Sequence, residues 1–168
     1  MKILVKKAKI SDAQEIKALV EPYAKEGIML PRPIYEIYEN IRDFSVAVID
    51  GKVVGCCAIH IFGKEYKLSK KKEEMILAEI RTLVVARPWQ RRKIGTRLVK
   101  SCIKEGRALG ITKIFVLTIK ENLDFFKKLC FETAPKMKLP QKIWQECIRC
   151  PRFPAECNEI PLILNIQP

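Results

Sequence analysis

One continuous stretch, residues 75–110, limits the possible folds of this chain more than any other. Its first part, MILAEIRTLVV at residues 75–85, is rich in β-branched and aliphatic residues and contains only two charges. This composition predicts a largely buried strand, which must end before Pro88 because proline cannot donate to a sheet ladder. Residues 94–109 place apolar side chains at helical spacing and basic ones on the other side. The stretch therefore predicts a strand, a sharp turn and an amphipathic helix.

The turn between this strand and this helix, QRRKIGT at residues 90–96, is basic and contains a glycine. The first N–H groups of a helix have no acceptor within the helix, and the helix dipole is positive at that end. Free N–H groups, a positive dipole end and three neighbouring cations together favour an anion. The sequence therefore predicts a site for a phosphate or a pyrophosphate at this turn.

The rest of the chain alternates strand-like and helix-like segments. Asp50-Gly51 lies between two β-rich runs and predicts a two-residue hairpin turn. Ser11 and Gln14 have the spacing of a capping box, with Ser11 as the N-cap of a helix that ends at Gly27. Strands are expected over 3–10, 44–49, 52–62, 113–119, from 131 and over 160–166, and helices over 11–25, 34–41, 122–129 and 139–147. This order predicts an α/β chain with a mixed sheet.

The run RPWQRRKIGTRLV, residues 87–99, resembles the acetyl-CoA pyrophosphate loop of the GNAT N-acetyltransferases, Q/R-x-x-G-x-G/A. Gln90 matches the first position and Gly95 the last, while Lys93 stands where the family usually has glycine. The order of elements is also that of the GNAT fold. The resemblance implies one acyltransferase domain over 1–168, with a mixed, mostly antiparallel sheet flanked by helices. It also implies acetyl-CoA as the co-substrate.

The resemblance assigns coenzyme contacts to the end of the strand, to the turn and to a later short helix. Backbone amides near Leu83 and Val84 would also serve as oxyanion donors. Many GNAT enzymes carry a tyrosine acid in the later helix, and this chain has phenylalanine there. The expected coenzyme-binding residues are Leu83, Val84, Val85, Gln90, Arg91, Arg92, Lys93, Ile94, Gly95, Thr96, Asn122, Phe125 and Phe126.

Further segments resemble one branch of the family, the short stand-alone N-acetylglutamate synthases. They are LPR at 30–32, DFSVA at 43–47, GCCA at 55–58, AEI at 78–80, KIFVLT at 113–118 and the tail LPQKIW at 139–144 with CxxCPxFP at 147–154. That branch transfers acetyl from acetyl-CoA to the α-amino group of L-glutamate, which opens arginine biosynthesis. The resemblance implies the same small-molecule reaction here, with glutamine or another amino acid as further substrates. It leaves open a homodimer.

Two residues are candidates for the chemistry. The amino group of the substrate must lose a proton before it attacks, and a carboxylate can accept this proton through water. Glu79 lies in the strand next to the coenzyme turn, where the family places its base; the alternative is a same-face ion pair with Arg81. Thr118 matches the hydroxyl that the synthase branch places near the coenzyme thiol, and an ordinary strand threonine is the alternative.

Glutamate carries two carboxylates, and arginine is the natural receptor for that group. Arg32 is the first candidate, because Pro31 and Pro33 on either side restrict its backbone. Arg81 and Arg149 are further candidates. For each of the three, a solvated surface charge is the alternative.

The remaining chemistry-bearing residues have several readings. His60, the only histidine, is expected to be a hydrogen-bonded histidine of the core or its rim, and a role in lining the substrate pocket is the alternative. A single histidine cannot organise a metal site. Cys147, Cys150 and Cys157 cluster near the end of the chain. Reduced thiols, one disulfide and a zinc site with a fourth ligand from elsewhere remain open for them.

The net charge of +13 admits a nucleic-acid-binding module as an alternative to an enzyme. Such a module needs exposed aromatics between its basic residues, whereas the aromatics here lie mostly in apolar runs. An acetyltransferase acting on protein amines is a second alternative. No apolar run reaches the ~20 residues of a membrane-spanning helix, and lysines interrupt the apolar N-terminus. We therefore expect a cytoplasmic protein without nucleic-acid or membrane partners.

Overall fold

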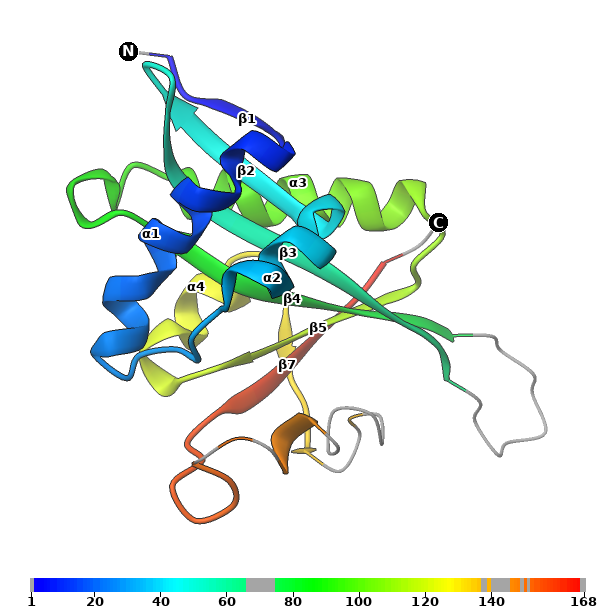
Figure 1. Cartoon of the computed structure of the whole chain (residues 1–168). Coiled ribbons are helices and arrows are strands. Elements are labelled where there is room, and N and C mark those ends of the chain that lie inside the picture. The colour runs from blue at the N-terminus through cyan, green and yellow to red at the C-terminus, as the bar shows by residue number, and fades with distance from the viewer. Residues whose placement is uncertain are drawn as a thin grey trace. The chain divides into compact units, whose positions relative to one another are not determined.

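The computed structural model describes residues 2–65, 75–136, 139, 146–148, 150 and 152–166 (Figure 1). The backbone divides into a first unit, residues 1–60 with 80–105, and a second unit, residues 61–79 with 106–168. The strands that the structure describes are hydrogen-bonded in the order β1-β2-β3-β4-β5-β7-β6. β4 (Met75–Val85) is parallel to β5 (Lys113–Thr118), whereas β1 with β2, β2 with β3, β5 with β7 and β6 with β7 are antiparallel. The predicted mixed sheet is confirmed.

The first unit begins with β1 (Leu4–Lys7), α1 (Ala13–Lys25) and α2 (Ile34–Glu39). β2 (Phe44–Ile49) and β3 (Lys52–Glu65) follow as the predicted hairpin. Its turn has positive φ at Asp50 (47°) and Gly51 (80°), which is the backbone that Asp-Gly favours between two strands. Short 3₁₀ turns at Ile10–Asp12, Ile41–Asp43 and Arg87–Trp89 connect the other elements.

The expected capping box at the start of α1 is wrong. The chain first makes the 3₁₀ turn that contains Ser11, and the α-helix starts two residues later at Ala13. The side chain that accepts a backbone N–H at this point is that of Asp12, because its Oδ2 accepts the backbone N–H of Lys9 at 2.8 Å. Lys6 forms an ion pair with the same carboxylate at 3.2 Å. The prediction that this helix ends at Gly27 is confirmed, since Gly27 follows the helix with a φ of 70°.

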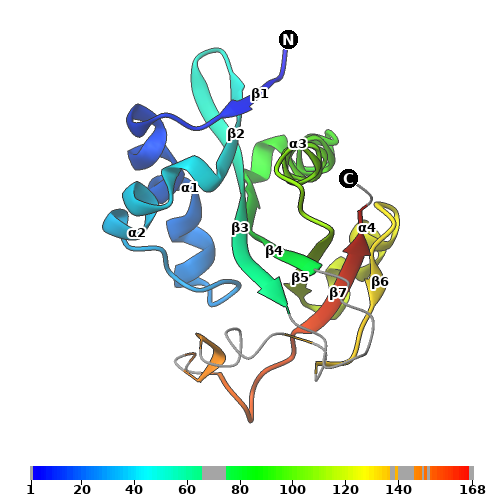
Figure 2. The ribbon, with the colours of Figure 1, turned by 90° about the vertical axis from the view of Figure 1, so that its right-hand side faces the viewer.

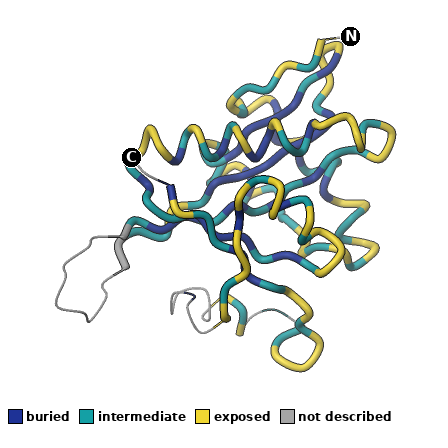
Figure 3. The backbone as a smooth tube through the Cα atoms, turned by 180° about the vertical axis from the view of Figure 1, so that it is seen from behind, coloured by how far each residue is buried: buried dark blue, intermediate teal, exposed yellow. Residues whose placement is uncertain are grey.

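Both faces of β2 and β3 are covered by helices within the first unit (Figure 2). Alternate strand residues pack against α1 and α2, among them Val46, Cys56 and Ala58. On the opposite face lies α3 (Ile94–Ala108), whose alternation of buried and exposed positions is visible in Figure 3. A Cβ at Gly55 would lie 3.1 Å from Leu98 Cδ1 and from the Val84 carbonyl oxygen. The helix therefore sits so close to the strand at this point that a side chain here would require its neighbours to move.

The second unit contains β5, α4 (Leu123–Lys127), β6 (Glu132–Thr133) and β7 (Ile160–Asn165), with a 3₁₀ turn at Lys120–Asn122. The core around Phe115 includes Leu77 and Leu139 and is completed by the ring of Phe62, 5.6 Å from that of Phe115. The helix expected over 139–147 lies largely outside the described residues.

Candidate active site

β4 departs from regular strand geometry at Thr82. Its φ is 54°, a left-handed value that is a genuine outlier for a β-branched residue. Such a backbone costs on the order of 1–3 kcal/mol and is found mainly at functional sites. The hydroxyl oxygen of Thr82 is buried without a hydrogen-bond partner in the described part of the chain, and its carbonyl lies 3.5 Å from the Cys56 thiol. The strand is thus locally strained and carries an unused polar group.

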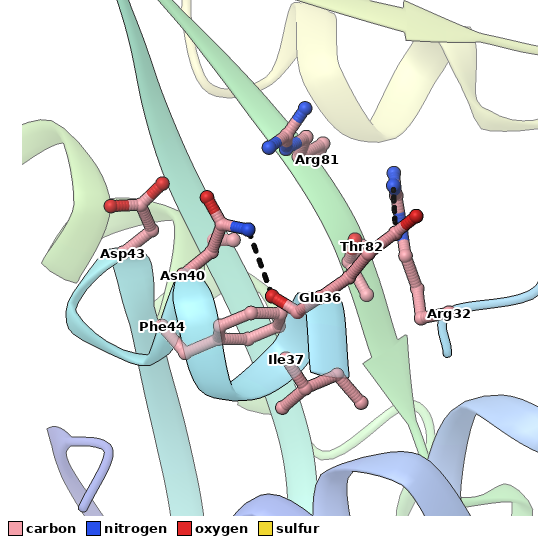
Figure 4. Close-up of a pocket in the computed structure, with 9 residues that line it drawn as sticks. Arg32, Glu36, Ile37, Asn40, Asp43, Phe44, Arg81 and Thr82 are labelled. Carbon is pink, nitrogen blue, oxygen red and sulfur yellow. Dashed lines mark hydrogen bonds and ion pairs between the residues drawn. The ribbon is translucent and has the colours of Figure 1, made fainter. Parts of the chain in front are cut away.

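Thr82 faces a pocket in the first unit that gathers charges from three segments (Figure 4). Arg32 comes from the segment before α2, Arg81 comes from β4, and Asp43 ends the turn before β2. The lining residues are Arg32, Glu36, Ile37, Asn40, Asp43, Phe44, Ala58, Arg81 and Thr82. Two predicted substrate-binding residues, Arg32 and Arg81, therefore line one pocket. The third, Arg149, lies outside the described residues.

Arg32 is only partly satisfied within this pocket. Its Nη1 lies 3.6 Å from Glu36 Oε2, a separation that allows an ion pair but exceeds a normal hydrogen bond. Its Nε is buried and has no hydrogen-bond partner among the described residues. A buried guanidinium N–H without an acceptor is costly, and a ligand oxygen would relieve that cost. The Nε–H group of Arg32 is therefore a donor that a ligand oxygen could satisfy.

Other contacts of the pocket are shorter. His60 Nδ1 on β3 lies 2.9 Å from Asp43 Oδ2, which confirms the expected hydrogen-bonded histidine. Asn40 donates its side-chain N–H to the backbone carbonyl of Glu36 at 2.8 Å and closes α2. The pocket thus combines guanidinium donors with carboxylate acceptors, which suits a ligand that carries both signs of charge.

The basic turn has the backbone of an anion-binding loop. Arg91 and Lys93 are left-handed, with φ of 58° and 61°, and α3 starts directly afterwards at Ile94. Successive backbone N–H groups in a turn of this kind can form a concavity that binds anions. The Lys93 carbonyl accepts the Arg97 N–H at 3.1 Å, so the first N–H groups of the helix are left for a ligand. Lys93 adopts the shape that glycine would usually supply, and the loop fits a pyrophosphate.

Tyr23 fixes the start of this loop and was not recognised from the sequence. Its hydroxyl donates to the Val85 carbonyl at 2.7 Å, and the Gln90 amide donates to the same carbonyl at 3.1 Å and to the Tyr23 oxygen at 3.0 Å. Gln90, an expected coenzyme contact, therefore uses its side chain to tie the loop to α1 and the end of β4. Arg92 lies over the Trp89 ring at 4.9 Å, which restricts one cation of the loop.

The other expected coenzyme residues differ in exposure. Ile94 and Val84 are core side chains, so they can offer only backbone groups to a ligand. In the second unit Asn122 is exposed ahead of α4, whereas Phe126 is buried between the rings of Phe125 and Phe131. Leu83, Val85, Gly95, Thr96 and Phe125 are half-buried. Their coenzyme contacts stay predictions.

The two expected chemical residues belong to the second unit. Glu79 is half-buried on β4 and lies opposite Phe115 of β5. Thr118 is buried at the end of β5, opposite Ile160 of β7. A half-buried carboxylate and a buried hydroxyl at these strand positions are compatible with chemistry, and their roles stay predictions.

The cysteines are free thiols throughout the structure. Cys147, Cys150 and Cys157 form no disulfide, and the described residues contain no group of three or more metal-ligating side chains placed to hold an ion. The structure therefore favours the reading of reduced thiols over a disulfide, and the zinc site stays a hypothesis. Burial raises the pKa of the Cys56 thiol to about 12 and that of Cys147 to about 11, which keeps both neutral at ordinary pH. None of the helices in the described part of the chain has the length and apolar character to span a bilayer.

Two curated proteins cover most of this chain. An uncharacterized N-acetyltransferase of Chlorobaculum tepidum is 39% identical over 162 residues, 96% of each chain. An amino-acid acetyltransferase of Mycobacterium tuberculosis is 30% identical over 87% of this chain and 78% of its own length.

The solved structure of the N-acetylglutamate synthase of Neisseria gonorrhoeae, complexed with coenzyme A and N-acetyl-glutamate, has a TM-score of 0.80 and 25% identity. It matches 100% of this chain, which spans only 36% of that synthase and 29% of the longer amino-acid acetyltransferase of Neisseria meningitidis. The family model of the acetyltransferase (GNAT) family matches residues 13–131. This match and the relatives of similar length show that the chain belongs to the GNAT family of acetyltransferases.

Proposed function

We propose that this acetyltransferase transfers acetyl from acetyl-CoA to the α-amino group of L-glutamate, or of a close relative such as glutamine. The observation that carries the proposal is the presence of Arg32 and Arg81 in the lining of one pocket. The relatives that act on amino acids, and the synthase structure that holds N-acetyl-glutamate, support the same substrate class.

The charge of the pocket suits an amino acid better than a peptide amine. An amino acid always brings its α-carboxylate, and glutamate brings another on its side chain. Guanidinium groups bind carboxylates through paired hydrogen bonds, and the buried Nε of Arg32 has no other acceptor in the described part of the chain. A lysine side chain or a protein N-terminus within a peptide brings no such carboxylate at this position.

The coenzyme is assigned to the loop of residues 90–96. Its left-handed backbone at Arg91 and Lys93 and the N-terminus of α3 suit the pyrophosphate of acetyl-CoA. Loop cations add attraction for the coenzyme phosphates. The backbone of Leu83 and Val84, just beyond the left-handed Thr82, is the proposed donor set for the oxyanion.

The proposed reaction is a direct transfer. Glu79 accepts a proton from the substrate ammonium through water, and the freed amine attacks the thioester carbonyl carbon. The oxyanion that forms is stabilised by backbone N–H groups. When it collapses, the new C–N bond stays, the C–S bond breaks and the coenzyme leaves as a thiolate. The attacking nitrogen sheds its extra proton, which restores the thiol, and Thr118 is the hydroxyl proposed to assist at the sulfur.

The biological setting is inferred from the synthase resemblance alone. It comprises the opening step of arginine biosynthesis and a cytoplasmic location.

The test is a substrate panel with the purified chain. Thiol release from acetyl-CoA is measured with each of the twenty amino acids and with a lysine-containing peptide. Glutamate or glutamine should give the highest rates, and Arg32→Gln and Arg81→Gln should each lower their kcat/KM by roughly 100-fold, since each removes a charge-assisted contact of about 2–3 kcal/mol. Arg42→Gln, at an exposed arginine in the 3₁₀ turn after α2 that is not among the pocket-lining residues, is the matched control and should change little. Release with the peptide but with no amino acid would overturn the proposal.

A further inference from the structure

The pair formed by Arg32 and Glu36 presents a donor and an acceptor side by side. The residues are four positions apart in the sequence, and Arg32 Nη1 lies 3.6 Å from Glu36 Oε2 (Figure 4). Arg32 Nε has no hydrogen-bond partner in the described part of the chain. Both residues line the pocket, and both side chains retain access to solvent, 25% for Arg32 and 37% for Glu36. A ligand that reaches Arg32 therefore also meets the carboxylate of Glu36.

The other acidic residue of the pocket, Asp43, interacts with a histidine. Asp43 Oδ2 lies 2.9 Å from His60 Nδ1, which directs that carboxylate toward β3. Glu36 is the lining acid that is ion-paired to a substrate-binding arginine. The charge that a ligand group experiences at Arg32 is thus set by the guanidinium and by Glu36 together.

A carboxylate and a carboxamide respond differently to such a pair. A carboxylate only accepts hydrogen bonds, so it gains from Arg32 but is repelled by the like charge of Glu36. A carboxamide has a carbonyl that accepts from the guanidinium and an NH₂ group that donates to the carboxylate. It satisfies both partners and brings no charge of its own.

We propose that Glu36 is a specificity-determining residue. Its negative charge weakens the binding of a side-chain carboxylate at Arg32 and thereby shifts the preference of the enzyme toward a side-chain carboxamide. The inference rests on the proposed function, because it assumes an amino-acid substrate whose side chain reaches Arg32. Glutamate and glutamine differ only in the terminal group, so they form a matched pair of probes. Removal of the Glu36 charge should shift the balance between them toward glutamate.

The test is the ratio of kcat/KM for glutamate to kcat/KM for glutamine in the wild type and in Glu36→Gln. Removal of one like charge at a partly exposed site should raise this ratio roughly tenfold. Glu39→Gln changes the charge of the same helix by the same amount at an exposed position outside the pocket, and it should leave the ratio unchanged. Glu36→Ala provides a second variant with high helix propensity, in case the amide side chain disturbs folding.

The outcomes separate the inference from the function on which it rests. An unchanged ratio in a folded, active Glu36 variant overturns the inference and leaves the proposed function intact. An equal rise for both substrates also overturns it, because Arg32 would then hold the α-carboxylate that both share. Wild-type protein that acetylates neither amino acid, and binds neither by calorimetry, overturns the proposed function and the inference together.

Discussion

The loop of residues 90–96 and the pocket of Arg32 and Arg81 belong to the same compact unit and differ in the groups that they offer to an anion. The loop relies on backbone: left-handed residues, a helix end and a carbonyl fixed by Tyr23. The pocket relies on side chains contributed by segments far apart in the chain. One arrangement is local in sequence, and the other exists only after the sheet and helices have packed.

This difference predicts unequal tolerance of substitution. A backbone-built site keeps its shape with any residue that can adopt the required φ, as Lys93 does in place of the usual glycine. A side-chain-built site loses its function when a single group is removed, because no neighbouring backbone can replace a guanidinium or a carboxylate. Mutations should therefore be costly at side chains that act directly and mild at loop positions.

The largest effect is expected at Glu79, where one carboxylate is proposed to perform the proton transfer. Glu79→Gln should lower kcat by roughly 100-fold or more, since general bases contribute about 10²–10⁴ in rate. The activity that remains should rise with pH, because deprotonated amine would then have to come from solution. Steady-state kinetics between pH 6 and pH 9.5 measure both effects.

Glu132→Gln is a suitable control for Glu79, because it removes a carboxylate at an exposed strand position of the same unit. It should leave kcat and the pH profile as they are. A Glu79→Gln variant with wild-type kinetics would remove Glu79 from the mechanism and contradict the expectation that side chains that act directly are the most costly to replace.

A smaller effect is expected at Tyr23, which supports the loop without being part of it. Tyr23→Phe deletes the O–H donor to Val85 and the acceptor for Gln90. The KM for acetyl-CoA should rise about fivefold and the free energy of unfolding should fall by about 1 kcal/mol, the usual worth of one such hydrogen bond. The KM for the amino acid should stay within twofold.

Initial-rate kinetics and urea unfolding test this prediction. Tyr38→Phe, at an exposed position of α2, is the matched control. A rise in the amino-acid KM with no change for acetyl-CoA would show that Tyr23 serves the pocket instead, and the division between the sites would have to be redrawn.

The smallest effect is expected at Lys93. Lys93→Gly allows the same left-handed backbone and removes the charge, whereas Lys93→Gln removes the charge and keeps a side chain at φ 61°. Both should raise the KM for acetyl-CoA by about twofold to threefold, more at low salt than at high salt. The free energies of unfolding of the two variants should differ by less than about 1 kcal/mol. Glycine relieves the strain of the left-handed backbone, but it also increases the conformational entropy that the chain loses on folding, and the two effects oppose each other. Unequal KM values would show that the side chain shapes the loop.

Local features were predicted well from the sequence. β4 has the predicted bounds, because its apolar run ends at a proline, and the Asp50-Gly51 hairpin follows from the turn chemistry of that pair. The loop was predicted because its motif, its charges and its helix are consecutive. The N-cap of α1 was wrong, since Ser11 is consumed by a 3₁₀ turn that the capping pattern does not distinguish from the helix itself.

Features made by tertiary packing were harder to predict. Arg32 and Arg81 were both named as receptors, but their presence in one pocket depends on how α2 packs on the sheet. The Tyr23 hydroxyl bonds to a carbonyl 62 residues away, and helical spacing marks this tyrosine only as apolar. The left-handed Thr82 has no signal in the sequence, because β-branched residues favour regular strand.

The Val85 carbonyl has a consequence for how a ligand enters. An oxygen of this kind has two lone pairs, and the Tyr23 hydroxyl and the Gln90 amide each donate to it. A third donor, such as an amide N–H of an incoming coenzyme arm, must take the place of one of them. Gln90 is exposed, so its side chain is the partner that an incoming donor can displace from the Val85 carbonyl. The displaced amide can then form a hydrogen bond with the ligand. The departure of Gln90 breaks its hydrogen bonds to both the Val85 carbonyl and the Tyr23 hydroxyl, so a ligand that displaces Gln90 must supply a new donor to each of these two oxygens.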